Sequence, residues 1–239
     1  MTTGLRQFTR TVAQLGWCDT ALYWLARRMA HASAGRWTIY RYRYVAQYLG
    51  DTCLPGRRGA DIDIRFHDAQ APLPGCPRPA PVIAARHAQG AQCLAAWRQR
   101  HLAGMLWLID HGYQEDEVRA RYRLASPHAC WDFDVWVHPD ERLGLTFARL
   151  WDTARQHLRA RGVRWSCSRI SAFNPASLRA HAALGIVPLG SALFVRCGSW
   201  QWMFASMAPR FHLSRSPASF PLMTFDTGAL AGPPAKELP

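Results

Sequence analysis

The feature that most constrains the fold is a change in the spacing of apolar residues near residue 140. Before it, short segments alternate apolar and other residues, as in DIDIRF at 61–66 and CWDFDVWV at 130–137. After it, apolar residues recur at helical spacing up to a glycine at 162: Leu143, Phe147, Leu150, Trp151, Ala154 and Leu158. Alternation is typical of strands, and recurrence every three to four residues is typical of an amphipathic helix. The sequence therefore predicts a series of strands followed by one long helix over 140–162.

Residues 5–82, before the series of strands, begin with another amphipathic pattern. Apolar residues spaced at helical intervals predict a helix over 5–34 that ends near Gly35. The aromatic and β-branched residues of 37–49 predict a strand, and DIDIRF at 61–66 predicts another. Five prolines within 67–82 indicate an irregular connection rather than a helix.

Further strands are expected on both sides of the long helix. Before it, four antiparallel strands in sequence predict one continuous sheet, with segments at 91–97, 102–110, 117–124 and 130–139. After it, we expect a strand at 163–171, a short helix at 174–184 and two closing strands at 187–197 and 199–207.

Length and composition suit one large domain with additions at its ends. The chain has 239 residues, of which 49% are apolar, so a packed core is expected. We expect an N-terminal helix-strand extension over 1–59, a main domain over 60–208 and a tail over 209–239. The tail is rich in proline, serine and glycine, which predicts disorder.

The charge and the cysteines narrow the class of protein. A net charge of +13 predicts an anionic partner. Almost every cation is arginine, since Lys236 is the only lysine. Arginine binds phosphate well, but a preference for arginine over lysine also arises from a GC-rich genome. Seven cysteines without a CxxC pair argue against a disulfide framework and against a metal site, so none is predicted. No apolar run is long enough for a membrane span, and the first residues lack a signal-peptide core. We therefore expect a cytoplasmic protein without a transmembrane segment.

The stretch VWVHPDERLGLTFARL, residues 135–150, carries the first functional motif. A strand here runs through a turn containing proline and glycine into the start of the long helix. The first N–H groups of a helix lack acceptors within the helix, and its dipole favours a negative charge at that end. This stretch predicts an anion site, with Arg142 and Arg149 as reinforcing cations.

The same stretch resembles the acetyl-CoA-binding turn of the GNAT (Gcn5-related N-acetyltransferase) superfamily. In that family a strand ending in V-x-P is followed by Arg or Gln and two spaced glycines at a helix start. Val137, Pro139 and Arg142 match by spacing. The two glycine positions fall on Leu145 and Phe147, and the glycine present, Gly144, comes one residue early.

The stretch FNPASLRAHAALGI, residues 173–186, carries the second match. The family typically has Asn, then Ala or Ser three residues on, Tyr at seven and Gly-aromatic at eleven and twelve. Asn174, Ser177 and Gly185 match this pattern, whereas His181 stands in place of the tyrosine and Ile186 in place of the aromatic residue. The resemblance covers roughly residues 60–207.

The resemblance implies an α/β (α+β) fold and a CoA thioester donor. We expect a V-shaped, mixed, mostly antiparallel sheet of about seven strands flanked by helices, in which 130–138 and 163–171 splay apart around the pantetheine arm. Acetyl-CoA or another acyl-CoA would then be the co-substrate. The residues expected to bind it are Val135, Val137, Arg142, Gly144, Leu145, Thr146, Asn174 and Ser177.

Acyl transfer to an amine needs a group that removes a proton from the amine. Asp132 and Asp134 are the first candidates, because they share one face of a predicted strand near the expected cleft. Flanking aromatic residues would desolvate these carboxylates and raise their pKa. The alternative is that they pair with arginines on the neighbouring strand. His181 is expected to protonate the leaving thiolate; the alternative is a solvated helix residue.

The sequence thus predicts an acyl-CoA-dependent N-acyltransferase, in which the amine attacks the thioester directly. Two alternatives stay open: an acyl-carrier-protein donor, which a basic surface would suit, and a catalytically inactive GNAT-shaped module that binds nucleic acid or membrane. The partners expected are a CoA thioester and an amine-bearing acceptor. A homodimer and a peripheral contact with a membrane or a carrier protein are further candidates.

Overall fold

The computed structural model describes residues 9, 11–50, 59–183 and 185–230. Its helices are α2 (Trp17–Ala32), α3 (Ala80–Ala88), α4 (Thr146–Ala160) and α5 (Pro175–Ala183), with a 3-10 turn η1 (Pro139–Glu141). The first strands along the chain are β1 (Trp37–Tyr48), β2 (Ile62–Phe66), β3 (Gln92–Arg98), β4 (His101–Asp110), β5 (Gly112–Gln114) and β6 (Arg121–Leu124). The later strands are β7 (Ala129–Val137), β8 (Trp165–Ser171), β9 (Val187–Cys197), β10 (Trp200–Ala205), β11 (Phe211–Ser214) and β12 (Leu222–Phe225).

The chain divides into two compact units, each assembled from separate stretches of sequence. Unit 1 consists of Met1–Gln47, Glu117–Arg121 and Arg169–Thr224. Unit 2 consists of Tyr48–Asp116, Tyr122–Ser168 and Phe225–Pro239. This division differs from the expected one, because β1 belongs with β9 and β10 rather than with a separate N-terminal extension.

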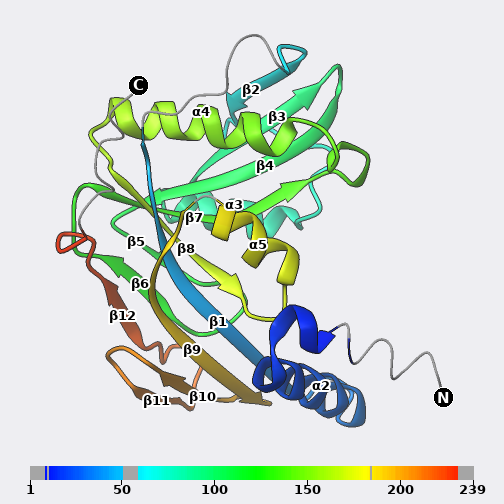
Figure 1. Cartoon of the computed structure of the whole chain (residues 1–239), viewed down its shortest axis with the longest axis vertical. Coiled ribbons are helices and arrows are strands. Elements are labelled where there is room, and N and C mark those ends of the chain that lie inside the picture. The colour runs from blue at the N-terminus through cyan, green and yellow to red at the C-terminus, as the bar shows by residue number, and fades with distance from the viewer. Residues whose placement is uncertain (1–8, 10, 51–58, 184, 231–239) are drawn as a thin grey trace. The chain divides into compact units, whose positions relative to one another are not determined.

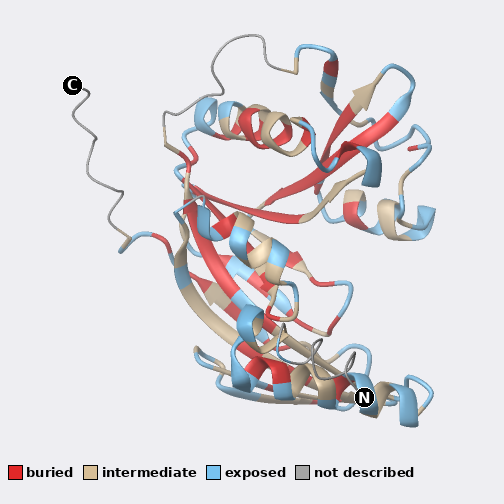
Figure 2. Cartoon of the chain, turned by 45° about the vertical axis from the view of Figure 1, so that its right-hand side comes forward, coloured by how far each residue is buried: buried red, intermediate tan, exposed pale blue. Residues whose placement is uncertain are grey.

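Unit 2 is built on a mixed, mostly antiparallel sheet, as the sequence predicts. Strands β2, β3, β4 and β7 pair antiparallel in that order, and β7 pairs parallel with the beginning of β8. Helix α4 contacts β2, β3, β4 and β7 and lies across the sheet (Figure 1). In Figure 2 the buried residues of this unit follow the strands and one side of α4. The apolar side chains of α4 therefore form the core with one face of the sheet.

Helix α3 covers the other face of that sheet. Leu106 and Leu108 of β4 belong to the core under α4, whereas Trp107, between them, contacts His87 of α3 at 4.9 Å between ring centroids. Neighbouring residues of a strand point to opposite faces. The two helices therefore sandwich β4 from its two sides.

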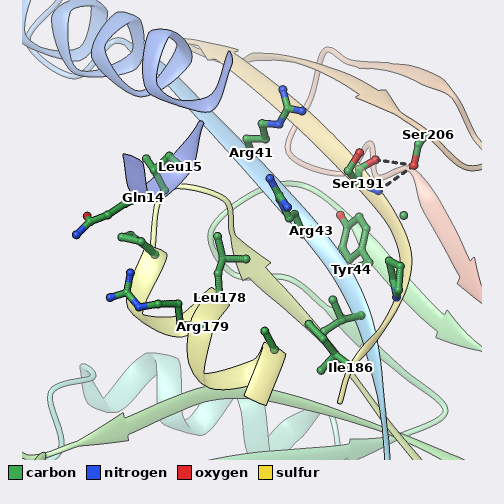
Figure 3. Close-up of a pocket in the computed structure, with 15 residues that line it drawn as sticks. Gln14, Leu15, Arg41, Arg43, Tyr44, Leu178, Arg179, Ile186, Ser191 and Ser206 are labelled. Atoms are coloured by element: carbon green, nitrogen blue, oxygen red, sulfur yellow. Dashed lines mark hydrogen bonds between the residues drawn. The ribbon is translucent and has the colours of Figure 1, made fainter. Parts of the chain in front are cut away.

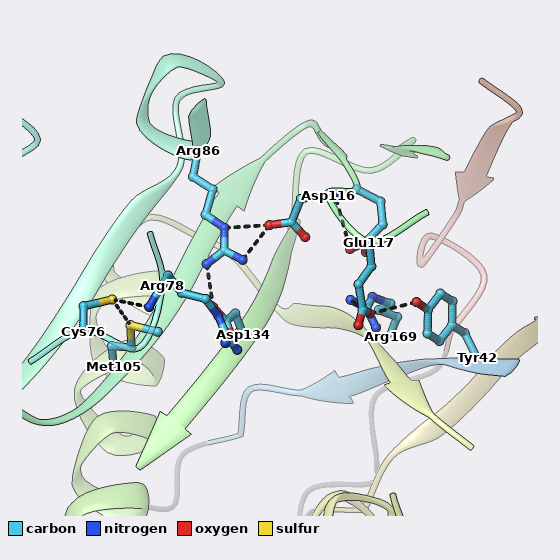
Figure 4. A network of polar contacts seen from close by, with 10 residues as sticks. Tyr42, Cys76, Arg78, Arg86, Met105, Asp116, Glu117, Asp134 and Arg169 are labelled. Atoms are coloured by element: carbon cyan, nitrogen blue, oxygen red, sulfur yellow. Dashed lines mark hydrogen bonds and ion pairs between the residues drawn. The ribbon is translucent and has the colours of Figure 1, made fainter. Parts of the chain in front are cut away.

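Unit 1 is built around β1. Ten residue pairs join β1 to β9, from Trp37↔Cys197 to Ala46↔Val187, and β9, β10 and β11 continue antiparallel. The short segment Glu117–Arg121 is held here through Glu117. Its carboxylate accepts a hydrogen bond from Tyr42 and forms an ion pair with Arg169 at 2.7 Å (Figure 4). These contacts keep a segment distant in sequence beside β1.

Several expected elements differ in extent from those in the structure. The helix expected over 5–34 is interrupted at Gly16, whose φ of 78° is outside the helical range, and α2 begins after it. The long helix begins at Thr146 rather than at 140, because Pro139–Glu141 form a 3-10 turn. The expected strand at 117–124 shortens to β6, which pairs with β5 and not with the sheet under α4.

Two segments expected to be irregular are ordered. The end of the proline-rich connection forms α3, because Pro79 and Pro81 lie at its N-terminal end, where proline's missing N–H is not needed. The expected tail contains β11 and β12, where Met223 and Phe225 are at most 1% exposed and fill core positions. The C-terminal residues 231–239 lie outside the described residues.

The packing of α4 gives a test of the core. Leu150 is 0% exposed and Leu143, in the turn before the helix, is 103% exposed. Leu150→Ala should lower the free energy of unfolding by about 2–5 kcal/mol, because it removes buried methyl groups and leaves a cavity. Leu143→Ala should change it by less than about 0.5 kcal/mol. Urea unfolding followed by fluorescence measures both; equal losses would contradict this packing.

Candidate functional site

The parallel pairing of β7 and β8 is short. Three residue pairs form it: Ala129↔Trp165, Cys130↔Ser166 and Trp131↔Cys167. At its end Ser166 donates a hydrogen bond from its hydroxyl to Asp132 at 2.5 Å, and both side chains are buried. Beyond this point β7 continues along β4 as far as Val137, which lies opposite Gly104. Such a short ladder is expected for strands that splay apart.

A β-bulge interrupts the alternation of β7 at Asp134. The register with β4 shifts between Met105 and Trp107, and Asp134 has a φ of 48°, which is rare for a residue other than glycine. Val135 then returns to the face under α4, where it packs against the core. Asp132 and Asp134, expected on one strand face, have different surroundings for this reason.

Asp134 is held by two arginines from the α3 region (Figure 4). Arg78 donates to both of its carboxylate oxygens, one of them from Nε at 2.7 Å, and Arg86 donates from Nη1 at 2.5 Å. Arg86 is 5% exposed at its side chain and also pairs with Asp116 at 2.6 Å. Its guanidinium lies 5.2 Å from the ring centroid of Phe133. Asp134 is therefore part of a buried ion-pair network.

This network decides the protonation state of Asp134. Burial by itself would raise the pKa of the carboxyl, but hydrogen bonds and charges from Arg78 and Arg86 outweigh it and hold the pKa below its ordinary value. The expectation of a raised pKa is therefore wrong for Asp134, and arginine pairing, the alternative, holds. The partners are arginines near and within α3 rather than on a neighbouring strand.

The turn between β7 and α4 leaves backbone donors at the helix start. Gly144 cannot contribute one, because its N–H donates to the carbonyl of Glu141 at 3.0 Å. The N–H groups of Leu145, Thr146 and Phe147 have no acceptor within the described part of the chain. The cap residue Leu145 provides no side-chain bond, and the first turn of α4 has no acidic residue. These donors can bind an anion.

The charged residues of this turn differ in burial: Glu141 is buried and Arg142 is exposed. Glu141 is buried and is neutralised by Arg98 at 2.9 Å, with His101 at 3.3 Å and the hydroxyl of Thr146 at 3.1 Å. Arg142, at the surface, has no ion-pair partner among the residues described. The buried acid is thus matched, and Arg142 remains available to a negatively charged ligand.

Helix α5, in unit 1, gives each of its expected polar residues a definite bond. The side chain of Asn174 caps the helix, accepting from the N–H of Ser177 at 3.0 Å. His181 is 8% exposed, and its Nδ1 lies 2.8 Å from the carbonyl oxygen of Ser177. Because a carbonyl only accepts, Nδ1 is the donor in this contact, and in a neutral ring Nε2 would then be the acceptor. Gly185, with a φ of 71°, follows the helix end.

Sequence reasoning missed the residues that surround Asp134. Arg78 and Arg86 lie in and after the proline-rich connection, and Asp116 lies in a turn. A signal existed for α3: prolines at its first positions and Gly90 just past its end, an asymmetry typical of helices. Nothing in the regular alternation of CWDFDVWV indicates the bulge.

Known proteins resemble the chain only in structure. No protein-family model matches the sequence, and a search of curated proteins gave no match. Solved structures similar to it include acetyltransferases of the GNAT family. A putative GNAT acetyltransferase from Novosphingobium aromaticivorans is 15% identical, with a TM-score of 0.44, over 65% of this chain and 62% of that one.

Two further structures are similar to the same degree. The Gcn5-related N-acetyltransferase from Sphaerobacter thermophilus is 13% identical, with a TM-score of 0.45, over 75% of this chain and 57% of that one. A tandem GNAT protein from the clavulanic acid biosynthesis pathway is 16% identical, with a TM-score of 0.42, over 67% of this chain and 55% of that one. The chain spans between 55% and 62% of the length of these three proteins.

The network around Asp134 predicts a pH-dependent loss of stability. Asp134→Asn should lower the free energy of unfolding by about 3 kcal/mol at pH 7, because it leaves buried Arg86 with less compensation. Since the folded pKa is lowered, the carboxylate's contribution is full above the ordinary carboxyl pKa of about 3.9 and is lost as the pH falls through the folded value. The difference between wild type and variant should therefore narrow below about pH 4.

Denaturant unfolding between pH 7 and pH 3 measures this difference. Asp63→Asn is the control, since Asp63 is 63% exposed and lies 3.6 Å from Arg65 on the same strand. That exposed pair should contribute less than about 1 kcal/mol at any pH. A difference between Asp134→Asn and wild type that stayed constant down to pH 3 would contradict the assignment.

Proposed function

We propose that this chain is an acyltransferase that uses acetyl-CoA or another acyl-CoA and acylates an amine. One observation carries the proposal: β7 leaves a three-pair ladder with β8 and runs through a turn into α4, whose first N–H groups have no acceptor among the described residues and can bind an anion. A strand edge beside an anion-binding helix start suits an extended ligand that has amide groups and a pyrophosphate.

Phosphate binding would rest on the turn before α4. The donors are the N–H groups of Leu145, Thr146 and Phe147, with Arg142 as the charged partner. The resemblance assigned this role partly to Gly144, but its N–H is engaged by Glu141, so the donors are shifted toward the helix. Val135 and Val137, at the end of β7, are proposed to bind the pantetheine amides.

The bound thioester would supply an activated acyl group, and the amine must be neutral to attack it. We assign removal of its proton to His181, because Nδ1 donates to Ser177 and leaves Nε2 as an acceptor. This reverses the expected role of His181, since a neutral ring has no second N–H to give to a leaving thiolate. The link between α5 and the donor rests on the motif resemblance, as do the roles of Asn174 and Ser177.

The two aspartates have other tasks in this proposal. Asp134, ionised and paired with Arg78 and Arg86, is a positioning residue that fixes the bulge from which β7 runs on to the turn. Asp132, hydrogen bonded to Ser166, fixes the end of the β7–β8 ladder. Neither is assigned the proton transfer.

The donor assignment is tested by calorimetry with acetyl-CoA and with S-acetylpantetheine, which lacks the pyrophosphate. Arg142→Gln should weaken acetyl-CoA binding about tenfold, the loss expected when a charged hydrogen bond to phosphate is removed, and leave S-acetylpantetheine unchanged. Arg123→Gln is the control, because Arg123 is an exposed arginine of β6 in the same unit. Absence of acyl-CoA binding in the wild type would overturn the proposal.

The role of His181 is tested by thiol release across a panel of amines. His181→Gln should lower kcat by about 10²–10⁴, the contribution of a general base, with little effect on the KM for acetyl-CoA. A kcat in His181→Gln equal to that of the wild type would remove His181 from the mechanism while leaving the donor site standing. Replacing acetyl-CoA by an acylated carrier protein in this assay distinguishes the two donors.

A further inference from the structure

Unit 1 contains a cavity of about 740 Å³, which is within the usual range for small-molecule sites. Figure 3 shows it between β1 and α5, with Gln14 and Leu15 at one end and Ser191 and Ser206 at the other. Every residue that lines it belongs to unit 1. It is therefore distinct from the turn before α4, which belongs to unit 2.

One wall of this cavity is cationic. Arg41 and Arg43 point from β1 and share the carboxylate of Asp19, at 2.9 and 2.7 Å. Asp19 is 4% exposed, whereas the two arginine side chains are 36% and 49% exposed. Each arginine has five N–H donors, and among the described residues the shared carboxylate of Asp19 accepts only a few of them. Arg179 of α5 is a third cation, and the lining includes no acidic side chain.

The facing wall is apolar. Leu178 and Ala182 project from α5, and Val45, Ile186 and Pro188 complete the surface. Residues 175, 178, 179 and 182 lie on one face of α5 by their spacing. That face is not the one that carries Ser177 and His181, so the short helix has two separate functional faces.

We propose that this cavity binds a small amphipathic anion, with a carboxylate or phosphate head group on an aliphatic body. Arg41 and Arg43 bind the head group, because arginine donates two parallel hydrogen bonds to either kind of oxyanion. The apolar body packs against Leu178, Ala182 and Ile186. Arg41, Arg43 and Arg179 carry three positive charges against the one negative charge of Asp19, so a net charge of +2 faces the apolar wall.

The probes are octanoate and octyl phosphate. Two controls match them: 1-octanol has the aliphatic chain without a charge, and acetate has the carboxylate without the chain. Calorimetry should give a single shared site for both octyl anions, at least tenfold tighter than for 1-octanol or acetate. Octyl phosphate against octanoate distinguishes the two head groups. Equal binding of octanoate and 1-octanol would overturn the proposal.

Variants separate the cavity from general electrostatics. Ala182→Trp fills the apolar wall from an exposed helical position and should abolish octanoate binding. Arg43→Gln should weaken octanoate binding at least tenfold. Arg179→Gln removes a cation of the cavity while both ion pairs of Asp19 remain. Arg28→Gln, an exposed arginine of α2, should leave binding unchanged. Thermal unfolding confirms that each variant is folded.

The outcomes are independent of the acyltransferase proposal. Acetyl-CoA binding should be the same in Ala182→Trp as in wild type, because residue 182 lies on the other face of α5 from Ser177 and His181 and the turn before α4 belongs to unit 2. Octanoate binding that persisted in Ala182→Trp, or that fell equally in Arg28→Gln, would show that the anion does not occupy this cavity.

Discussion

The ion pairs of Asp134 with Arg78 and Arg86 are the interaction on which the architecture of unit 2 depends. A residue other than glycine at positive φ in a strand costs about 1–3 kcal/mol and persists only when its surroundings compensate. Here two guanidinium groups fix the carboxylate, and one of them also stacks over Phe133. The bulge that results turns Val135 back to the core and sets how β7 enters the turn before α4.

Much of the fold follows from the sequence because periodicity reports burial. The strands at 37–48 and 187–197 and helix α4 were predictable from alternation or from helical spacing. The bulge at Asp134 was not predictable, because one extra residue in a strand leaves the apolar-polar alternation of the sequence unchanged while it moves the following side chains to the other face. The prolines of 67–82 predict an irregular connection, whereas Pro79 and Pro81 lie at the start of α3. The pattern therefore does not predict the arginines near and within α3 that neutralise Asp134.

The motifs predict the turn before α4 and helix α5 where the structure has them, but not the hydrogen bonds of their residues. The N–H of Gly144 donates to the carbonyl of Glu141, and Nδ1 of His181 lies 2.8 Å from the carbonyl oxygen of Ser177. Such details depend on which acceptor lies within 3 Å, and residue spacing cannot report that. The two faces of α5 also have different surroundings, since one carries Ser177 and His181 and the other lines the cavity of unit 1.

The division of the chain has a consequence for how the protein is made. Both units are discontinuous, and the chain passes from one to the other five times: inside β1, before Glu117, inside β6, inside β8 and inside β12. No single cut would release either unit as an unbroken fragment. During synthesis β1 leaves the ribosome long before β9, its antiparallel partner, so the edge of β1 that pairs with β9 stays unpaired until residues 187–197 have been made. Folding of this topology should be slow and dependent on late, non-local pairing, and exposure of β1 is its main opportunity for aggregation.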